Sequence, residues 1–599
     1  MTRQTATAPL LLALASAIST PCAVAAQDTR IADIIPGQPL LVIGVPSWSD
    51  LTTSMSASGF GDFWRDDQIQ GLIAKVMEEP AANFKQAMEE IGVDPEDVQQ
   101  PTGLIAGALY LDAPLDMLDD PEIDFAIFAD YDDTAEDMIE IVERVLEQGE
   151  EEGEIRVHED TYAGARLWII EPDELPRDED NDDEWDDAPE FPWENLTLAL
   201  SDGVFILASD TDMLEQSIDA LGGEDIDSVA DHDLYTDSLA QHPDASDAWA
   251  VFVPTPLIDA FAAGVASSAP DGIDANKILE TLGIRDIQSV SLAMSFSDPA
   301  LLMEQSLAVL VPEKRGLVAL FDTEGAAFTP PPFISADAAS VSRFSINFEG
   351  VLQVVRDTMA QLPEGMRAQP EAVFEGMIAP IAAPLLSSLG SEVWFTQSYA
   401  QPFTPDSAKS LVIASTNDEG AMSDLLVNIP GMEGREFAGG MIYTNAMGAE
   451  MGVEAPSIGL AAGHVFIGPA QSIENAMRRA ANPGAGSLAD EPRFRKGAAW
   501  LDERALGFMY TDIVQAYRWT KWSMDNIEQI QRAELEQMGL EPEQIDEMME
   551  WMGDTRPAWA DSLPSDELIA EYFGDTFGQV QSTDEGFLWT SYWLRGDPE

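Results

Sequence analysis

The chain of 599 residues is poor in cysteine and histidine, and each shortage excludes a class of chemistry. Its single cysteine, Cys22, lies in an N-terminal segment that we expect to be removed, which would leave no disulfide and no thiol nucleophile. The sequence also lacks phosphate-binding loops, dinucleotide fingerprints and a serine nucleophile motif. We therefore predict no cofactor and no catalytic residue of these classes.

The four histidines are His158, His232, His242 and His464. Only His232 and His242 are close in sequence, and a zinc site built from them with Asp231 or Asp233 would require the loop to fold back. We interpret both as solvated polar residues.

Basic residues are scarce as well. The chain has 29 Lys plus Arg against 109 Asp plus Glu, a net charge of −80, and this field would repel nucleic acid. The acids are spread along most surface-like segments, which indicates general adaptation to saline surroundings. A dedicated cation-binding surface is the alternative, and it would concentrate the acids on one face.

Long hydrophobic runs are absent after the first two dozen residues, so we predict no transmembrane segment in the mature chain. Arg3, the apolar run 9–18 and the small residues 23–26 form the pattern of a bacterial signal peptide. Pro21 before Cys22 argues against a lipid anchor. We predict that residues 1–26 are removed and that the mature protein is exported, soluble, and resident in the periplasm or cell envelope.

Two stretches roughly 260 residues apart share one pattern of apolar positions, small residues and turns. The first contains Tyr162-Ala163-Gly164, apolar runs at 195–200 and 203–208, a helical segment, and Ser228-Val229-Ala230-Asp231. The second contains Phe437-Ala438-Gly439, runs at 457–462 and 464–468, a helical segment, and Ser487-Leu488-Ala489-Asp490. His464 takes the place of Gly203, which predicts a turn position. The polar residues are not shared, so the duplication indicates a scaffold.

The periodicities predict an α+β fold of two pseudo-repeat halves, each a mainly antiparallel sheet packed with helices. The first half spans 27–325 and carries an acidic insertion near 173–192. The second spans 326–599 and carries a helical insertion near 512–570, in which we expect Trp519, Trp522 and Trp551 to pack in the core. A helix over 66–91 should break at Pro80.

Asp178, Asp180 and Asp182, in the acidic insertion, have the alternating spacing of a calcium loop. The sixth position is Asp183 instead of glycine, and the twelfth is Pro189 instead of glutamate. We therefore expect only non-specific cation binding there, and no specific metal site.

The paired halves resemble an uncharacterised family of exported bacterial proteins, a domain of unknown function. The turns at 162–164 and 437–439, the strands at 203–208 and 463–468, and the helix starts at 228–231 and 487–490 carry the resemblance. The stretches 312–320 and 336–340 resemble the link between the halves. The resemblance implies an architecture and an exported location, and brings no catalytic residues.

These observations favour a non-enzymatic scaffold or binding protein with an unidentified envelope partner or ligand. One alternative is a carboxylate-dependent hydrolase with its cleft between the halves, which would require buried, converging acids. Another is a protein that binds an apolar ligand between the halves.

Overall fold

The computed structural model describes residues 29–90, 92–111, 123–153, 155–172, 193, 195–243, 246–268, 272–445, 457–482, 486–553 and 556–596. The predicted signal peptide and the acidic insertion near 173–192 lie outside these ranges. The fold is mixed α+β, as predicted, and its main feature is a large antiparallel sheet.

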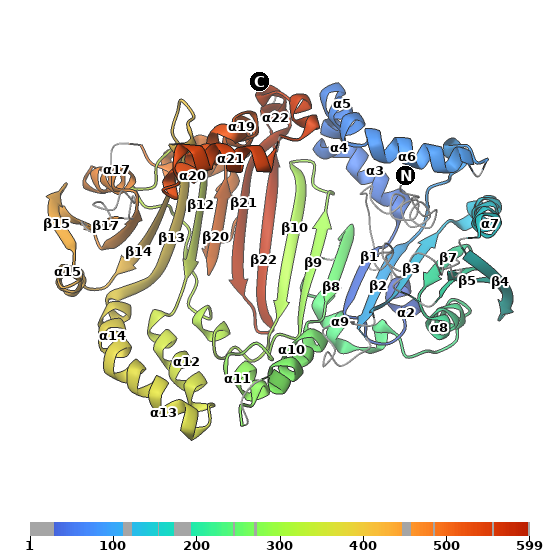
Figure 1. The fold of residues 1–599 in the computed structure, drawn as a ribbon, viewed down its shortest axis with the longest axis horizontal. Coiled ribbons are helices and arrows are strands. Elements are labelled where there is room, and N and C mark those ends of the chain that lie inside the picture. Colours follow the sequence, from blue (N-terminus) through green and yellow to red (C-terminus); the bar gives the residue numbers. More distant parts are fainter. Residues whose placement is uncertain are drawn as a thin grey trace.

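Twenty strands pair side by side, every pair antiparallel, in one continuous sheet (Figure 1). From one edge to the centre they are β4 (Ile155–Tyr162), β5 (Ala165–Pro172), β6 (Leu196–Ser201), β7 (Val204–Ala208), β3 (Ile123–Asp130), β2 (Ile105–Leu111), β1 (Leu41–Val45), β8 (Ala248–Phe252), β9 (Ser289–Ser295) and β10 (Leu301–Leu310). From the centre to the other edge they are β22 (Gly586–Arg595), β21 (Phe573–Ser582), β20 (Gly507–Thr511), β12 (Ser340–Ser345), β13 (Leu389–Tyr399), β14 (Ala408–Thr416), β18 (His464–Gly468), β17 (Ser457–Ala461), β16 (Gly440–Asn445) and β15 (Met432–Phe437).

The pairing of β10 with β22 joins the two sides of this sheet, with Ser306 opposite Thr590 near its midpoint. Outward from β10 the strands follow the order β9, β8, β1, β2, β3, β7, β6, β5, β4. Outward from β22 they follow β21, β20, β12, β13, β14, β18, β17, β16, β15. Strands at the same position in the two series therefore also come at the same position in the chain order of their own side of the sheet.

Helices cover one face of the sheet along its whole width. On the first side these are α2 (Thr29–Ile34), α8 (Thr211–Leu221), η4 (Val229–Asp231) and α9 (Asp233–Leu239), and on the second α17 (Ala470–Ala481), η8 (Leu488–Asp490) and α18 (Pro492–Ala498). On the opposite face, α7 (Ala135–Glu152) and α15 (Glu419–Val427) pack over the outer strands only.

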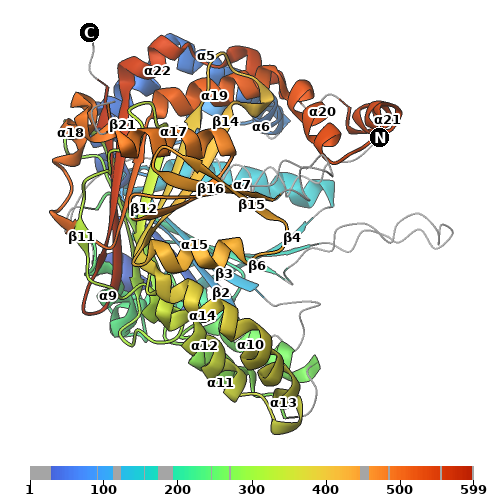
Figure 2. The same cartoon turned by 90° about the vertical axis from the view of Figure 1, so that its left-hand side faces the viewer.

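Two helical layers border the ends of the central strands and project forward of the sheet (Figures 1 and 2). The upper layer holds α3 (Trp48–Ala57), α4 (Gly59–Trp64), α5 (Asp67–Val76), α6 (Glu78–Glu90), α19 (Ile513–Asp525), α20 (Ile527–Gln537), α21 (Pro542–Met552) and α22 (Asp566–Tyr572). The lower layer holds α10 (Thr255–Ser268), α11 (Ala275–Thr281), α12 (Phe348–Ala360), α13 (Glu364–Val373) and α14 (Ala379–Ser388).

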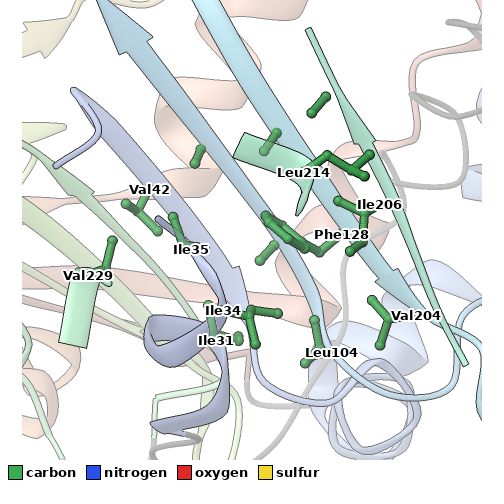
Figure 3. Close-up of a cluster of buried hydrophobic side chains, with 14 of the residues drawn as sticks. Ile31, Ile34, Ile35, Val42, Leu104, Phe128, Val204, Ile206, Leu214 and Val229 are labelled. Carbon is green, nitrogen blue, oxygen red and sulfur yellow. The ribbon is translucent and has the colours of Figure 1, made fainter. Parts of the chain in front are cut away.

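The main core lies between the sheet and the helices that cover it. In the close-up of Figure 3, Ile31 and Ile34 of α2 and Leu214 of α8 surround Phe128 of β3, and all four side chains are buried. An equivalent cluster on the second side includes Phe466, Ile473 and Met477. Alternation along each strand places these apolar residues on one face.

Several local predictions hold and others fail. The helix over 66–91 breaks at Met77, between α5 and α6, so that Pro80 falls in the first turn of α6, where its missing amide hydrogen leaves no helical bond unmade. Trp519 stacks on Tyr399 and on Trp522, but both tryptophans are only partly buried, so the predicted core packing holds only in part. Trp551 is 86% exposed, contrary to the prediction, because the buried face of α21 is set by Ile545 and a residue six positions later points away from it.

Candidate functional site

The central strands bury one face and expose the other. On β10, Ser306 and Ala308 are buried, whereas Leu307 between them is 37% exposed. We call the side packed against α9 and α18 the covered face and the other side the open face. In Figure 1 no helix crosses in front of β10, β22 and β21 on the open face, and Figure 2 shows α9 and α18 on the opposite side.

A lateral row of apolar residues crosses the open face. Strand register places side by side Ile43, Ala250, Leu292, Leu307, Trp589, Val580, Gly507, Phe344 and Val393. Flanking rows add Phe252, Val290, Val309 and Phe587 on one side and Met294, Met509 and Phe395 on the other. At about 4.8 Å per strand, the row extends for about 38 Å.

The open face carries no charge at its centre. Among the described open-face positions of β1, β8, β9, β10, β22, β21, β20 and β12, the one charged residue is Arg595. It lies at the end of β22 and pairs with Asp62 of α4 at 2.8 Å, so the centre of the open face is uncharged. Its polar groups are neutral, such as Gln305 and Ser591, which lie opposite each other. In a chain with 23% charged residues, this is a selective absence.

Two glycines on adjacent strands near one edge of the row differ in packing between the two faces. A Cβ atom at Gly107, on the open side of β2, would meet nothing within 4 Å. A Cβ atom at Gly44, on the covered side of the adjacent β1, would lie 2.4 Å from the ring of Trp249. Single exposed apolar residues are ordinary, but a continuous uncharged patch of this extent is typical of a binding surface.

The covered face holds a polar cluster at its centre instead. His242 Nδ1 lies 2.7 Å from Ser306 Oγ, and His242 Nε2 lies 2.8 Å from Ser291 Oγ. Burial lowers the pKa of His242 to about 4, so the ring is neutral at physiological pH. Both ring nitrogens are engaged and the residue is buried, so it serves as a structural hydrogen-bonding group; the expectation that His242 is solvated was wrong.

Two buried carboxylates, Asp512 and Asp575, flank the guanidinium of Arg493. Arg493 Nη1 donates to Asp512 Oδ2 and lies 3.5 Å from Asp575 Oδ1. Burial raises the pKa of Asp575 to about 6, and repulsion from Asp512 contributes to the rise. Asp575 shares the covered side of β21 with Phe577, so this pair does not face the open side of the sheet or the β10–β22 junction.

The other residues singled out in the sequence are separated. Asp178, Asp180 and Asp182 lie outside the described residues. His158 is in β4, and His232 Nδ1 is 3.0 Å from Gln38 Nε2. His464 opens β18 instead of occupying the turn, because Ala462 and Gly463 carry the positive φ angles of 53° and 77° that the turn needs. Among the described residues, no group of three or more His, Cys, Asp or Glu could hold a metal ion.

The open face was missed in the sequence because its residues look like core residues. The sequence predicts strands over 289–296 and 301–311 as one pair and over 577–581 and 586–594 as another. Apolar residues on both faces of these segments indicate strands buried on both sides. The helical segments α10, α11, α13 and α14 were not predicted. In α13 and α14, Pro370 and Pro384 interrupt the helical pattern.

Neither the family models, the curated proteins nor the solved structures include a match to this chain.

Proposed function

We propose that the protein is a non-enzymatic binding protein whose open face takes the apolar chain of an elongated, uncharged or zwitterionic amphiphile, such as the acyl chain of a lipid. The observation that supports this most directly is the uncharged apolar row centred on Leu307 and Trp589, which no helix covers. A ligand chain that covers this row would remove apolar surface from water, which stabilises the complex by about 25 cal/mol per Å² of buried surface.

The charge distribution supports an uncharged ligand. An anionic head group would meet a protein of net charge −80. The two cations at the rim of the open face, Lys314 over the ring of Phe587 and Arg595 at the end of β22, are held by Asp322 and Asp62. The face offers the partly exposed Gln305 as a neutral hydrogen-bonding group at its centre, whereas Ser591 opposite it is buried. A zwitterionic or uncharged head group therefore fits the site best.

The geometry gives less support to a hydrolase. Such an enzyme would need carboxylates directed at the ligand, whereas Asp512 and Asp575 lie on the covered side and are engaged with Arg493. His242 is likewise turned away from the open face. These placements favour binding over catalysis.

We further propose that the two sides of the sheet are copies of one unit and that the protein is exported, as in the family it resembles. The equivalent strand orders about β10 and β22 support the duplication. Matching two-residue turns add support, since Ala163-Gly164 and Ala438-Gly439 have φ values of 48° and 92° and of 45° and 85°. A duplicated unit would place the ligand across the junction of its copies.

The experiment uses the mature chain, residues 27–599, and a lysophosphatidylcholine carrying a nitrobenzoxadiazole group on its acyl chain, held below its micelle concentration. The fluorescence of this probe rises in an apolar environment. We expect saturable binding to the wild-type protein. The variant Leu307→Glu should weaken binding at least tenfold, because the bound chain would desolvate a carboxylate that has no partner.

The matched control is Leu317→Glu. Leu317 is 42% exposed, close to the 37% of Leu307, but it lies in the link after β10 and not on the open face. The control should bind the probe like the wild type. Equal affinities for the two variants, or a lack of saturable binding by the wild type, would contradict the proposed function.

A further inference from the structure

Helix α14 in the lower layer carries apolar residues on its inner side and on its outward side. Its inner side packs against α12 through Ala379, Ala382 and Ala383. Ile381 is 68% exposed, and Met377 and Ile378, in the turn just before the helix, are exposed as well. A helix at a water-facing surface ordinarily carries polar or charged residues on its outward side.

Helix α10 in the same layer repeats this arrangement. Its Ala262 is buried against α11, where Ala275 and Leu279 complete the contact. On its outward side Phe261 is 60% exposed and Leu257 is also exposed. Leu257 and Phe261 are four residues apart and therefore lie on one side of the helix.

Charge is nearly absent from both helices. Residues 376–390 contain no charged side chain, although the chain has 109 acids. The acid just before them, Glu375, pairs with Arg356 of α12 at 2.7 Å. The single acid of α10, Asp259, pairs with Arg285 at 2.7 Å. The charges nearest these outward faces are thus held by partners within the protein.

The same helices border the open face of the sheet. Helix α10 follows β8 directly after Pro254, and α14 runs into β13, whose Phe395 is exposed on the open face. Both helices belong to the layer that projects forward of the sheet at its lower edge (Figure 2). A surface in contact with α10 and α14 would therefore adjoin the proposed ligand site.

We propose that the outward sides of α10 and α14 dock on the surface of a zwitterionic lipid membrane and insert their large apolar side chains among its acyl chains. This inference rests on the proposed function, since the docked membrane would supply the amphiphile. Interfacial helices bury such side chains about 5–10 Å into the boundary between head groups and acyl chains. Among the described residues no helix is long and apolar enough to cross the membrane, so the contact is superficial.

Charge decides between this partner and the other candidates. An anionic membrane would repel a protein of net charge −80, and the patch has no Lys or Arg to offset that repulsion. A second copy of the chain would bring the same charge. The uncharged patch fits a surface without net charge.

The test is co-sedimentation of the mature protein with vesicles of dioleoylphosphatidylcholine, and with vesicles in which half of the lipid is phosphatidylglycerol. We expect binding to the zwitterionic vesicles and weaker binding to the anionic ones at low salt. The double variant F261D/I381D should lose at least tenfold in partitioning. The control M538D/W551D alters residues of similar or greater exposure in the upper layer and should bind like the wild type.

The vesicle-free probe assay separates this inference from the proposed function. F261D/I381D should keep the affinity of the wild type for the monomeric lysophosphatidylcholine probe, whereas Leu307→Glu loses it. Equal vesicle binding by both double variants would overturn the docking surface, as would a preference for anionic vesicles. A wild-type dimer in sedimentation velocity that F261D/I381D dissociates would assign the patch to a second copy and overturn the membrane proposal.

Discussion

His242 and Ser306 are joined by a hydrogen bond of 2.7 Å beneath the central strands, and this contact makes stability depend on pH. Burial lowers the pKa of His242 from 6.5 to about 4, so below pH 6.5 the unfolded chain takes up a proton that the folded protein does not. The stability that His242 contributes is therefore complete above pH 6.5 and is lost as the pH falls toward 4. At pH 5 the loss is about 2 kcal/mol.

The variant His242→Gln should remove this dependence. Urea unfolding at pH 7 and pH 5 would show the variant less stable than the wild type at pH 7, because a hydrogen bond is lost, with the difference shrinking by about 1–2 kcal/mol at pH 5. A difference that stays constant with pH would mean that His242 titrates alike in the folded and unfolded states.

Asp575 should have the opposite dependence. Its pKa is raised to about 6 by burial, and its Oδ2 atom has no hydrogen-bond partner. Because the folded protein holds the proton of Asp575 more tightly than the unfolded chain does, Asp575 adds its full contribution to stability below pH 3.8. This contribution is lost as the pH rises through 6. Asp575→Asn should therefore stabilise the protein by about 1–2 kcal/mol at pH 8 and have little effect at pH 4.

Asp512→Asn provides the contrast, measured by the same unfolding curves. Asp512 accepts from the backbone N–H of Gln515 at the start of α19 and pairs with Arg493. Asparagine preserves the capping acceptor and removes the charge, so this variant should be less stable than the wild type at pH 8. If both variants shifted stability in the same direction, burial would not be the dominant effect on Asp575.

Local features of the fold were readable from the sequence because they depend on neighbouring residues. Helix α8, Thr211–Leu221, is the helical segment predicted after the apolar run at 203–208, and Asp210 caps its first turn by accepting from the amide of Met213. The turn at Ala163-Gly164 was likewise recognised. In these places the periodicity and the capping or turn residues agree.

Long-range features were not readable in this way. The β10–β22 pairing joins residues such as Ser306 and Thr590, and no local pattern indicates that these strands meet, so two separate sheets were predicted instead of one. The open face was not predicted for a related reason. Leu307 and Trp589 resemble buried strand residues until the absence of a covering helix is known.

The different packing of the two faces yields a prediction about glycines on adjacent strands. Gly44→Ala would place a Cβ atom against Trp249 on the covered face and should destabilise the protein by about 1–3 kcal/mol. Gly107→Ala adds the same methyl group on the open face, where nothing lies within 4 Å, and should change stability by less than about 0.5 kcal/mol. Thermal unfolding of both variants tests whether the open face is uncovered in solution. A large loss of stability in Gly107→Ala would show that other atoms pack against the open face at this position.

The turns at Ala163-Gly164 and Ala438-Gly439 allow a test of the duplication. Both alanines have a positive φ, 48° and 45°, a conformation that asparagine adopts more readily than alanine. Ala163→Asn and Ala438→Asn should each stabilise the protein by about 0.5–1 kcal/mol, and a double variant should show the sum because the turns are far apart. Gly164→Ala and Gly439→Ala serve as the reverse controls, since their φ values of 92° and 85° strain any residue with a Cβ atom. Matching responses at both sites would support two copies of one hairpin, whereas a gain at one site and a loss at the other would show that the turns only look alike.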